Sequence, residues 1–320
     1  MIKGFLRYCL TLLSFFYKND LSRLQKRHEI ITKKLKNKLQ YIKFEKEIKC
    51  KTHKIFSNFV YDIILKNNTI NFLRNANIQN IFFIHNRFFI LNELRELQKD
   101  KDKWKLWKKL LVENNVGDPI RYFLYPKTSG NRIRQVYYLK KYYDYSKIEL
   151  LKVNNILEIG GGYGCMAQIF KKINEKCTYV IFDTKEVNFL QYYYLQMNKI
   201  PVVMNKIKTG KICLINNLDL IKKFNKKITR NSNSLFIANW SISEMPIILR
   251  NNILNKIKNF SNSIISFQEK FENINNKNYF AKYKKKIEKK VFFEIEKFKF
   301  YKKNFFNKND HFYLFTKSRT

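Results

Sequence analysis

The spacing of apolar and polar residues divides the chain into a helical first half and an alternating second half. Residues 21–54 are predicted to form a single long helix, with apolar residues on one stripe and charged residues elsewhere. The apolar residues of this stripe are Leu21, Leu24, Ile31, Leu35, Leu39 and Ile42. Further helical spacing covers about 55–74, 78–98 and 103–113. After a loop through Pro126 and 129–131, another helix is predicted at 133–143.

From residue 154 onward, short apolar runs alternate with helical segments. Strands are predicted at 154–159, 178–183, 211–215, 234–239 and 262–268, and helices at 164–174, 186–198, 217–227 and 246–258. Such alternation indicates a parallel sheet covered by helices on both faces. Alternating residues from Val291 to Ile295, a turn at 307–310 and a strand from His311 to Thr316 predict a closing antiparallel hairpin.

The predicted fold class is therefore α/β, with a doubly wound sheet of seven strands behind an N-terminal helical region. We divide the chain into an apolar segment at 1–20, a helical lid region at 21–145 and an α/β domain at 146–320. The uncharged run Tyr8–Tyr17 is shorter than the roughly 20 apolar residues that span a bilayer. It fits an uncleaved signal core, an interfacial membrane anchor or a packed helix, and these alternatives stay open.

The net charge and the cysteine content say more about the cellular compartment of the protein than about its binding partner. The chain has 64 Lys+Arg against 25 Asp+Glu, but the lysines occur in every segment, which favours a solvated basic surface over a polyanion site. The five cysteines are odd in number and lack C-x-x-C spacing, so neither a disulfide framework nor a zinc site is indicated. A cytoplasmic protein is expected, with peripheral contact at the inner face of the membrane if the N-terminal segment is an anchor.

Four of the eight glycines fall within residues 160–164, between a predicted strand and a predicted helix. A bare turn at the carboxyl end of a parallel strand presents backbone N–H groups to a nucleotide-like ligand. A dinucleotide fingerprint would need a small residue at 165, where Cys165 stands. The next strand ends in Asp183, 19 residues beyond Gly164, and a carboxylate there can accept from two vicinal hydroxyls.

The pattern Glu158-x-Gly160-x-Gly162-x-Gly164 resembles the cofactor loop of class I S-adenosylmethionine-dependent methyltransferases. The resemblance implies S-adenosylmethionine as cofactor and a sheet of five parallel strands with a C-terminal antiparallel hairpin. It also implies that the loop wraps the amino-acid end of the cofactor and that an acid after the next strand holds the ribose. The residues implicated in cofactor binding are Glu158, Gly160, Gly161, Gly162, Tyr163, Gly164, Asp183 and Asn239. The alternative is a glycine turn that binds nothing.

Four blocks in order narrow the resemblance to bacterial sugar O-methyltransferases. They are 115–119, 157–164, 182–195 and 239–245, and the likeness covers roughly residues 114–270. It implies methyl transfer to a hydroxyl of a sugar in surface glycan synthesis, with a nucleotide-activated or lipid-linked acceptor. Arg132, Arg134 and Gln135 would suit a phosphate on such an acceptor, and the alternative makes them exposed residues at a helix start.

A sugar hydroxyl needs a base to accept its proton. Glu244 follows the fourth strand and is the first candidate, although a carboxylate near the start of a helix at Pro246 has a purely structural alternative role. His85, in the lid region, is the second candidate. His28 is expected to be solvated and His311 to lie far from the cofactor edge. No histidine pair has metal-ligand spacing, so no metal is predicted.

Two other function classes remain open at this stage. The basic charge and the aromatic content also fit an RNA methyltransferase or an RNA-binding protein. Nucleic acid is nevertheless not expected as a partner, because the sequence signatures of base methylases are absent. A membrane-associated scaffold that kept the fold and lost activity is the second alternative, since fold alone does not establish function.

Overall fold

The computed structural model describes residues 18–39, 60–64, 69–81, 89–229, 233–300 and 309–319. Residues 1–17, with the predicted membrane anchor, and His85 lie outside these described residues. The chain divides into two compact units, which are treated separately below. Unit 1 comprises 1–137, 162–169 and 184–201, and unit 2 comprises 138–161, 170–183 and 202–320.

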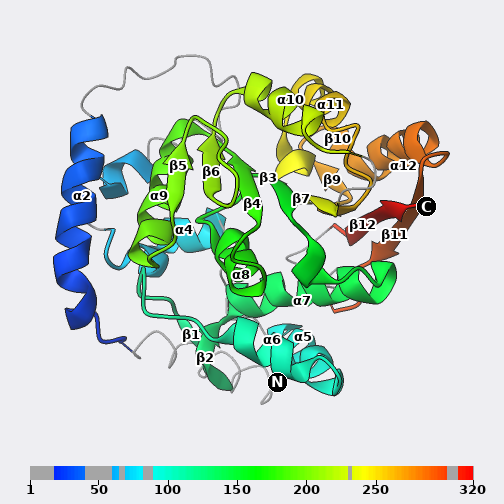
Figure 1. Cartoon of the computed structure of the whole chain (residues 1–320). Coiled ribbons are helices and arrows are strands. Elements are labelled where there is room, and N and C mark those ends of the chain that lie inside the picture. Colours follow the sequence, from blue (N-terminus) through cyan, green and yellow to red (C-terminus); the bar gives the residue numbers. More distant parts are fainter. Residues whose placement is uncertain are drawn as a thin grey trace. The chain divides into compact units, whose positions relative to one another are not determined.

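Unit 2 is built on a mixed β-sheet (Figure 1). Among the described residues its strand order is β5-β6-β4-β3-β7-β8-β12-β11. The first six are parallel, and β12 lies antiparallel between β8 and β11. The strands are β3 (Asn155–Ile159), β4 (Thr178–Phe182), β5 (Val202–Met204), β6 (Ile212–Ile215), β7 (Ser234–Asn239), β8 (Ser263–Gln268), β11 (Val291–Lys297) and β12 (His311–Ser318).

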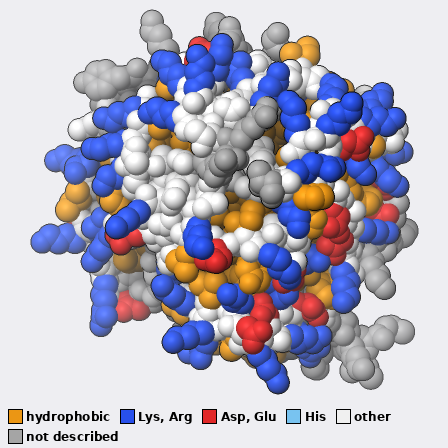
Figure 2. Space-filling model, turned by 45° about the vertical axis from the view of Figure 1, so that its right-hand side comes forward, with side chains coloured by type: hydrophobic (Ala, Val, Ile, Leu, Met, Phe, Trp, Pro, Cys, Tyr) orange, Lys and Arg blue, Asp and Glu red, His pale blue; other side chains and the backbone are white. Residues whose placement is uncertain are grey.

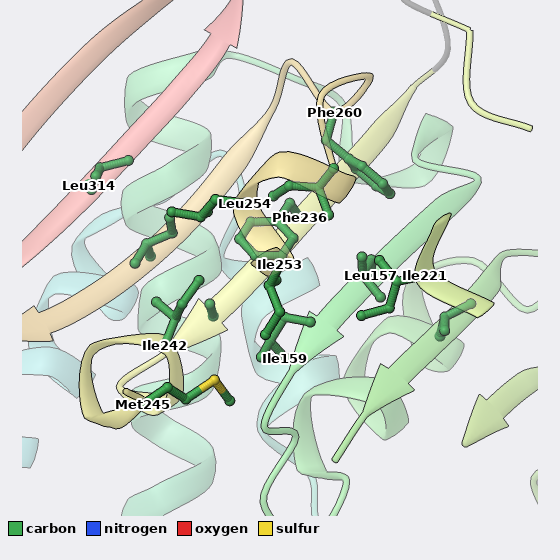
Figure 3. Close-up of a cluster of buried hydrophobic side chains, with 14 of the residues drawn as sticks. Leu157, Ile159, Ile221, Phe236, Ile242, Met245, Ile253, Leu254, Phe260 and Leu314 are labelled. Carbon is green, nitrogen blue, oxygen red and sulfur yellow. The ribbon is translucent and has the colours of Figure 1, made fainter. Parts of the chain in front are cut away.

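The central strands are continuous apolar runs because both faces of the sheet are covered within unit 2. On one face α10 (Leu218–Lys226) and α11 (Ile247–Lys256) contribute side chains to a buried cluster with Leu157 and Phe236 of the sheet (Figure 3). Successive residues of β12 point to opposite faces. Leu314 joins that cluster, whereas the next residue, Phe315, meets the Tyr142 ring of α7 (Gly130–Ser146) on the other face, at 5.9 Å between centroids.

This arrangement confirms the predicted fold class, including the five parallel strands and the closing hairpin. It adds elements that the sequence pattern did not predict. β5 is a three-residue strand at the outer edge beside β6, too short to give a periodic signal. After β8 come a small hairpin of β9 (Lys270–Phe271) and β10 (Ile274–Asn275), and the helix α12 (Asn276–Ile287).

Unit 1 is mainly helical among its described residues. Residues 60–64 are also helical. Its elements are η1 (Ser22–Leu24), α2 (Gln25–Leu39), η2 (Phe72–Arg74), α4 (Ala76–Ile81), α5 (Phe89–Lys99), α6 (Trp104–Leu111), the hairpin β1 (Arg121–Tyr122) and β2 (Tyr125–Ser129), and α9 (Lys185–Met197). The helices α7 (Gly130–Ser146) and α8 (Cys165–Ile173) each give residues to both units. The loop predicted through Pro126 is wrong, because 125–129 pair as a strand and α7 starts directly at Gly130.

The expectation that His28 is solvated is also wrong. The residue is 6% exposed, and its Nδ1 lies 2.7 Å from the Tyr193 hydroxyl of α9. The neighbouring Arg27 donates from Nε and Nη2 to the Gln196 carbonyl at 2.9 and 2.7 Å. A helix remote in sequence therefore covers His28, and the local lysine-rich sequence gave no sign of it. The domain boundary near residue 146 stays a prediction.

Basic side chains are scattered over the face of the molecule in Figure 2, between acidic and apolar ones. They form no single stripe on this face. Within the described part of the chain, no helix combines the length and apolar character needed to cross a membrane.

Candidate active site

Polar residues stand at the carboxyl ends of neighbouring strands of unit 2. Glu158 is in β3, Asp183 follows β4, Asn239 ends β7 and Gln268 ends β8. The carboxyl ends of parallel strands lie at one edge of the sheet, so these residues share that edge. The chain order reverses at β3, which lies between β4 and β7, and ligands of open α/β sheets bind at such a switch point.

Gly160 begins the turn after β3, and its backbone packs directly against Ser241 in the segment after β7. Its φ is +69°, and a Cβ on it would lie 2.3 Å from the Cβ of Ser241. Its N–H donates to the Phe182 carbonyl at 2.9 Å, and the Ser241 hydroxyl donates to the Ile159 carbonyl. Only glycine meets both the left-handed conformation and the lack of space.

Glu158 lies beneath this turn, inside the protein. Its Oε2 accepts from the Tyr179 hydroxyl at 2.9 Å and would be 3.0 Å from a Cβ on Gly161. Burial raises the pKa of Glu158 to about 8; the Tyr179 hydrogen bond opposes this rise, and the charge of Asp183 adds to it. The two predicted carboxylates are therefore close enough to interact, and Glu158 supports the turn from within.

The second half of the glycine turn belongs to unit 1. Gly162 has φ +55°, and its carbonyl accepts from the Gln191 side chain at 2.9 Å. Gly164 has φ +96°, and a Cβ there would lie 3.4 Å from Leu195 of α9. Tyr163 is buried, and its hydroxyl accepts from the Asn131 amide at 2.9 Å. Since the Tyr163 ring faces the interior of unit 1, its backbone is what it can offer a ligand.

Asp183 is partly exposed directly after β4, and its N–H donates to the Ile215 carbonyl at 3.1 Å. At the end of β7, Asn239 accepts from the Ser266 hydroxyl at 3.3 Å through Oδ1. Its Nδ2 is buried and has no hydrogen-bond partner in the part of the chain described here. This amide is one donor that the protein itself leaves unused.

Trp240 turns the chain sharply after β7. Its φ of +70° and ψ of −44° lie in a strained region for a residue with a side chain, and such strain concentrates at functional sites. The turn is held by the Trp240 N–H, which donates to the Ser266 carbonyl at 2.8 Å, and by the indole N–H, which donates to the Tyr138 hydroxyl at 3.1 Å.

Glu244 ends the short helix η4 (Ser241–Glu244) that follows this turn. Its Oε1 accepts from Nε2 of Gln268 at 3.3 Å, and burial raises its pKa to about 7. The following helix α11 has Pro246 as its N-cap and no side-chain capping bond. The hydrogen bond of Glu244 thus goes to β8 and does not cap α11, and its pKa suits proton exchange near neutrality.

His311 was expected far from this edge, and that expectation is wrong. β12 is antiparallel, so its first residue lies where β8 ends, and His311 pairs in register with Gln268. Its ring meets the Trp240 ring edge-on at 4.8 Å between centroids. The direction of the last strand, which the sequence pattern had predicted, was sufficient to place it there.

Of the three residues predicted to suit a phosphate, Arg132 and Arg134 are buried and Gln135 is partly buried. Arg132 is fully buried and donates to the Leu110 carbonyl at 2.6 Å and to Gln168, while Nε of Arg134 lies 3.6 Å from Glu93. The two arginines are therefore not exposed residues at a helix start, and both are engaged within unit 1. Among the described residues, no group of three or more His, Cys, Asp or Glu is arranged to hold a metal ion.

The sequence analysis missed Tyr179 and Gln268, which hold the two carboxyl groups. Gln268 ends the fifth predicted parallel strand, so the rule that selected Asp183 and Asn239 would have found it. Tyr179 gave no such signal, because a tyrosine within an apolar strand is ordinary core composition.

No known protein family and no curated protein matches this chain. Solved structures give weak likenesses. A protein of Thermoplasma acidophilum has TM-score 0.39 and 10% identity, covering 68% of this chain and 98% of that one. An arsenic(III) S-adenosylmethionine methyltransferase from Chlamydomonas reinhardtii has TM-score 0.36 and 12% identity, and the match covers 53% of this chain and 64% of that one. An O-methyltransferase from Bacillus cereus, in complex with SAH, has TM-score 0.37 and 9% identity, and the match covers 54% of this chain and 77% of that one. Likenesses this weak carry no argument, and the fold rests on the strand order itself.

The glycine turn generates a prediction about stability. Gly160 and Gly210 both have left-handed φ, +69° and +70°, but a Cβ on Gly210 would meet its nearest atom only at 3.6 Å. Gly210→Ala should cost about 1–2 kcal/mol of unfolding free energy, the ordinary cost of that conformation. Gly160→Ala should cost clearly more, because Ser241 must also move. Urea unfolding of both variants measures the difference, and equal losses would contradict the close packing.

The buried acid Glu158 generates a prediction about pH. Its folded pKa of about 8 exceeds the ordinary 4.5, so the folded state binds the extra proton between these values. The unfolding free energy should therefore fall as pH rises from about 4.5 to 8. Glu158→Gln should flatten this slope, while Glu175→Gln, at an exposed position, should leave it unchanged. Chemical unfolding at a series of pH values decides, and a wild-type slope in Glu158→Gln would refute the assignment.

Proposed function

We propose that this protein is an S-adenosylmethionine-dependent O-methyltransferase that acts on a sugar hydroxyl. The observation that carries the proposal is the edge of the unit 2 sheet. There a glycine turn follows β3, carboxyl groups stand in β3 and after β4, and Glu244, with a pKa near neutrality, follows β7. When bound, the cofactor would supply an electrophilic methyl group on a sulfonium.

The residues at this edge fit such a cofactor. Asp183 is partly exposed and can accept from two ribose hydroxyls. The bare backbone of Gly160 and Gly161 permits close approach of a ligand. The unpaired Nδ2 of Asn239 is a donor at the same edge. Glu158, fixed by Tyr179, would act through the shape of the turn.

Glu244 is the proposed base. Its pKa is raised to about 7, so the carboxyl group can exchange a proton near neutral pH and, when ionised, can take the proton of an acceptor hydroxyl. In the proposed reaction Glu244 would accept this proton from the acceptor oxygen and then return it to solvent. Alignment of the reacting atoms supplies the remaining rate enhancement.

The sugar acceptor rests on the resemblance of four sequence blocks between residues 114 and 270. A nucleotide-activated or lipid-linked sugar of a surface glycan is the proposed acceptor, and a cytoplasmic enzyme with peripheral contact at the inner membrane face is the proposed location. The N-terminal segment and His85, the second candidate base, remain predictions because they lie outside the described residues.

The cofactor assignment predicts binding that depends on Asp183. The wild-type protein should bind S-adenosylmethionine and its demethylated product in isothermal titration. Asp183→Ala should weaken binding by roughly 1.5–3 kcal/mol, the range for a hydrogen bond to a charged group. Glu149→Ala, which removes an exposed acid elsewhere in unit 2, should bind like wild type. A folded wild-type protein that releases no heat would exclude the cofactor, whereas an unaffected Asp183 variant would exclude only the ribose role.

The assignment of Glu244 predicts a selective loss of turnover. Glu244→Gln keeps the shape but removes basicity, so turnover should fall by about 10²–10⁴ while cofactor affinity stays near wild type. Labelled cofactor would be offered with nucleotide-activated sugars, lipid-linked sugars and RNA, and Glu149→Gln is the matched control. Transfer to RNA alone would reject the sugar, and nearly full turnover by Glu244→Gln with chemistry rate-limiting would reject the base.

A further inference from the structure

We propose that Gln268 is a positioning residue that orients the carboxyl group of Glu244, and that Arg250 and Asn276 hold both residues in place. We call Ser243, Arg250, Gln268 and Asn276 the Glu244 clamp. Its significance for catalysis rests on the proposed function, since Glu244 is the proposed base. All of its members belong to unit 2.

Arg250 fixes the backbone on both sides of Glu244. Its side chain is fully buried in α11, and Nη2 donates to the carbonyls of Ser243 at 2.8 Å and Met245 at 2.9 Å. The guanidinium lies over the Tyr279 ring at 4.6 Å. Ile242 and Met245 point into the hydrophobic cluster (Figure 3), so the segment is anchored by apolar contacts as well. The backbone that carries Glu244 is therefore held on both sides.

Asn276, at the start of α12, connects this anchor to Gln268. Its Oδ1 accepts from Nη1 of Arg250 at 2.7 Å, and its Nδ2 donates to the Gln268 carbonyl at 3.0 Å. The side chain is fully buried, so both bonds form away from water. The backbones that carry Glu244 and Gln268 are thereby tied to one guanidinium.

The Gln268 amide is oriented toward Glu244. Its Oε1 lies 3.0 Å from Oγ of Ser243, and the Trp240 carbonyl oxygen lies 2.5 Å from the same Oγ. The single proton of the Ser243 hydroxyl is shared between these two acceptors. With Oε1 so engaged, Nε2 faces Glu244 and donates to Oε1 of that carboxyl at 3.3 Å. Asn276 and Ser243 thus determine where the one described donor to Glu244 stands.

This donor has a direct effect on the protonation of Glu244. Burial raises the pKa of Glu244, and the bond from Gln268 lowers it, since an N–H donor favours the ionised form. Three charged or titratable residues lie nearest to Glu244 in the fold. They are Arg250 of α11, whose guanidinium donates to backbone carbonyls, Glu269, which directly follows β8, and His311 of β12, which pairs with Gln268. Gln268 therefore opposes burial and keeps the carboxyl able to ionise near neutral pH.

Gln268→Met tests the clamp, because it nearly keeps the shape and removes the donor. The titration of Glu244 is obtained by subtracting the pH dependence of unfolding of Glu244→Gln from that of the wild type, which needs no acceptor. In the Gln268→Met background the midpoint should rise by about one unit, the shift expected from loss of one hydrogen bond to a charged group. Gln79→Met removes an equally buried glutamine in unit 1 and should leave the midpoint unchanged.

Gln268→Glu gives a second variant should Gln268→Met not fold. It places a like charge beside Glu244, so the midpoint should rise further. With an accepted sugar, the acid limb of the kcat profile should shift by the same amount, and activity should recover at higher pH while cofactor affinity is unchanged.

An unmoved midpoint in the folded Gln268 variants would overturn the clamp, even if methyl transfer is found. A moved midpoint without methyl transfer to any acceptor would support the orienting role and reject only the proposed reaction.

Discussion

The contact between Gly160 and Ser241 is the constraint on which the candidate site depends. A Cβ on Gly160 would come within 2.3 Å of the Ser241 side chain, so the turn after β3 and the segment after β7 are packed at the limit of approach. The turn brings Gly161 over the buried Glu158, and the segment carries Trp240, Ser243 and Glu244. The ends of β3 and β7 are thus held side by side at the edge of the sheet.

Two carboxyl groups at this edge have raised pKa values, and burial is the main cause for both. Glu158 interacts with a tyrosine hydroxyl and with the nearby charge of Asp183, and its pKa is about 8, whereas that of Glu244 is about 7. Neither forms an ion pair among the described residues. Glu158 is enclosed beneath the glycine turn, whereas Glu244 is only partly buried. One carboxyl is therefore suited to support and the other to proton transfer.

The sequence was sufficient for the parallel sheet and the glycine turn, because buried strands are continuous apolar runs and the glycines are clustered. The sequence was insufficient for residues whose side-chain contacts come from distant parts of the chain. His28 is covered by Tyr193 of α9, and the orientation of Glu244 depends on Gln268 and, through Asn276, on Arg250. β5 was missed because three residues carry no periodicity. Positions set by strand order were predictable, and positions set by side-chain contacts were not.

Part of the +39 formal charge lies inside the protein, on buried arginines. Arg121, Arg132 and Arg250 are buried and donate to backbone carbonyls, and Arg134 is buried beside Glu93. An arginine so engaged cannot offer its planar fork to a phosphate. These four guanidiniums stabilise the interior of the protein and do not contribute to a basic surface. A phosphate on the acceptor is therefore not expected to be held by these four arginines, because their guanidiniums are buried and engaged within the protein.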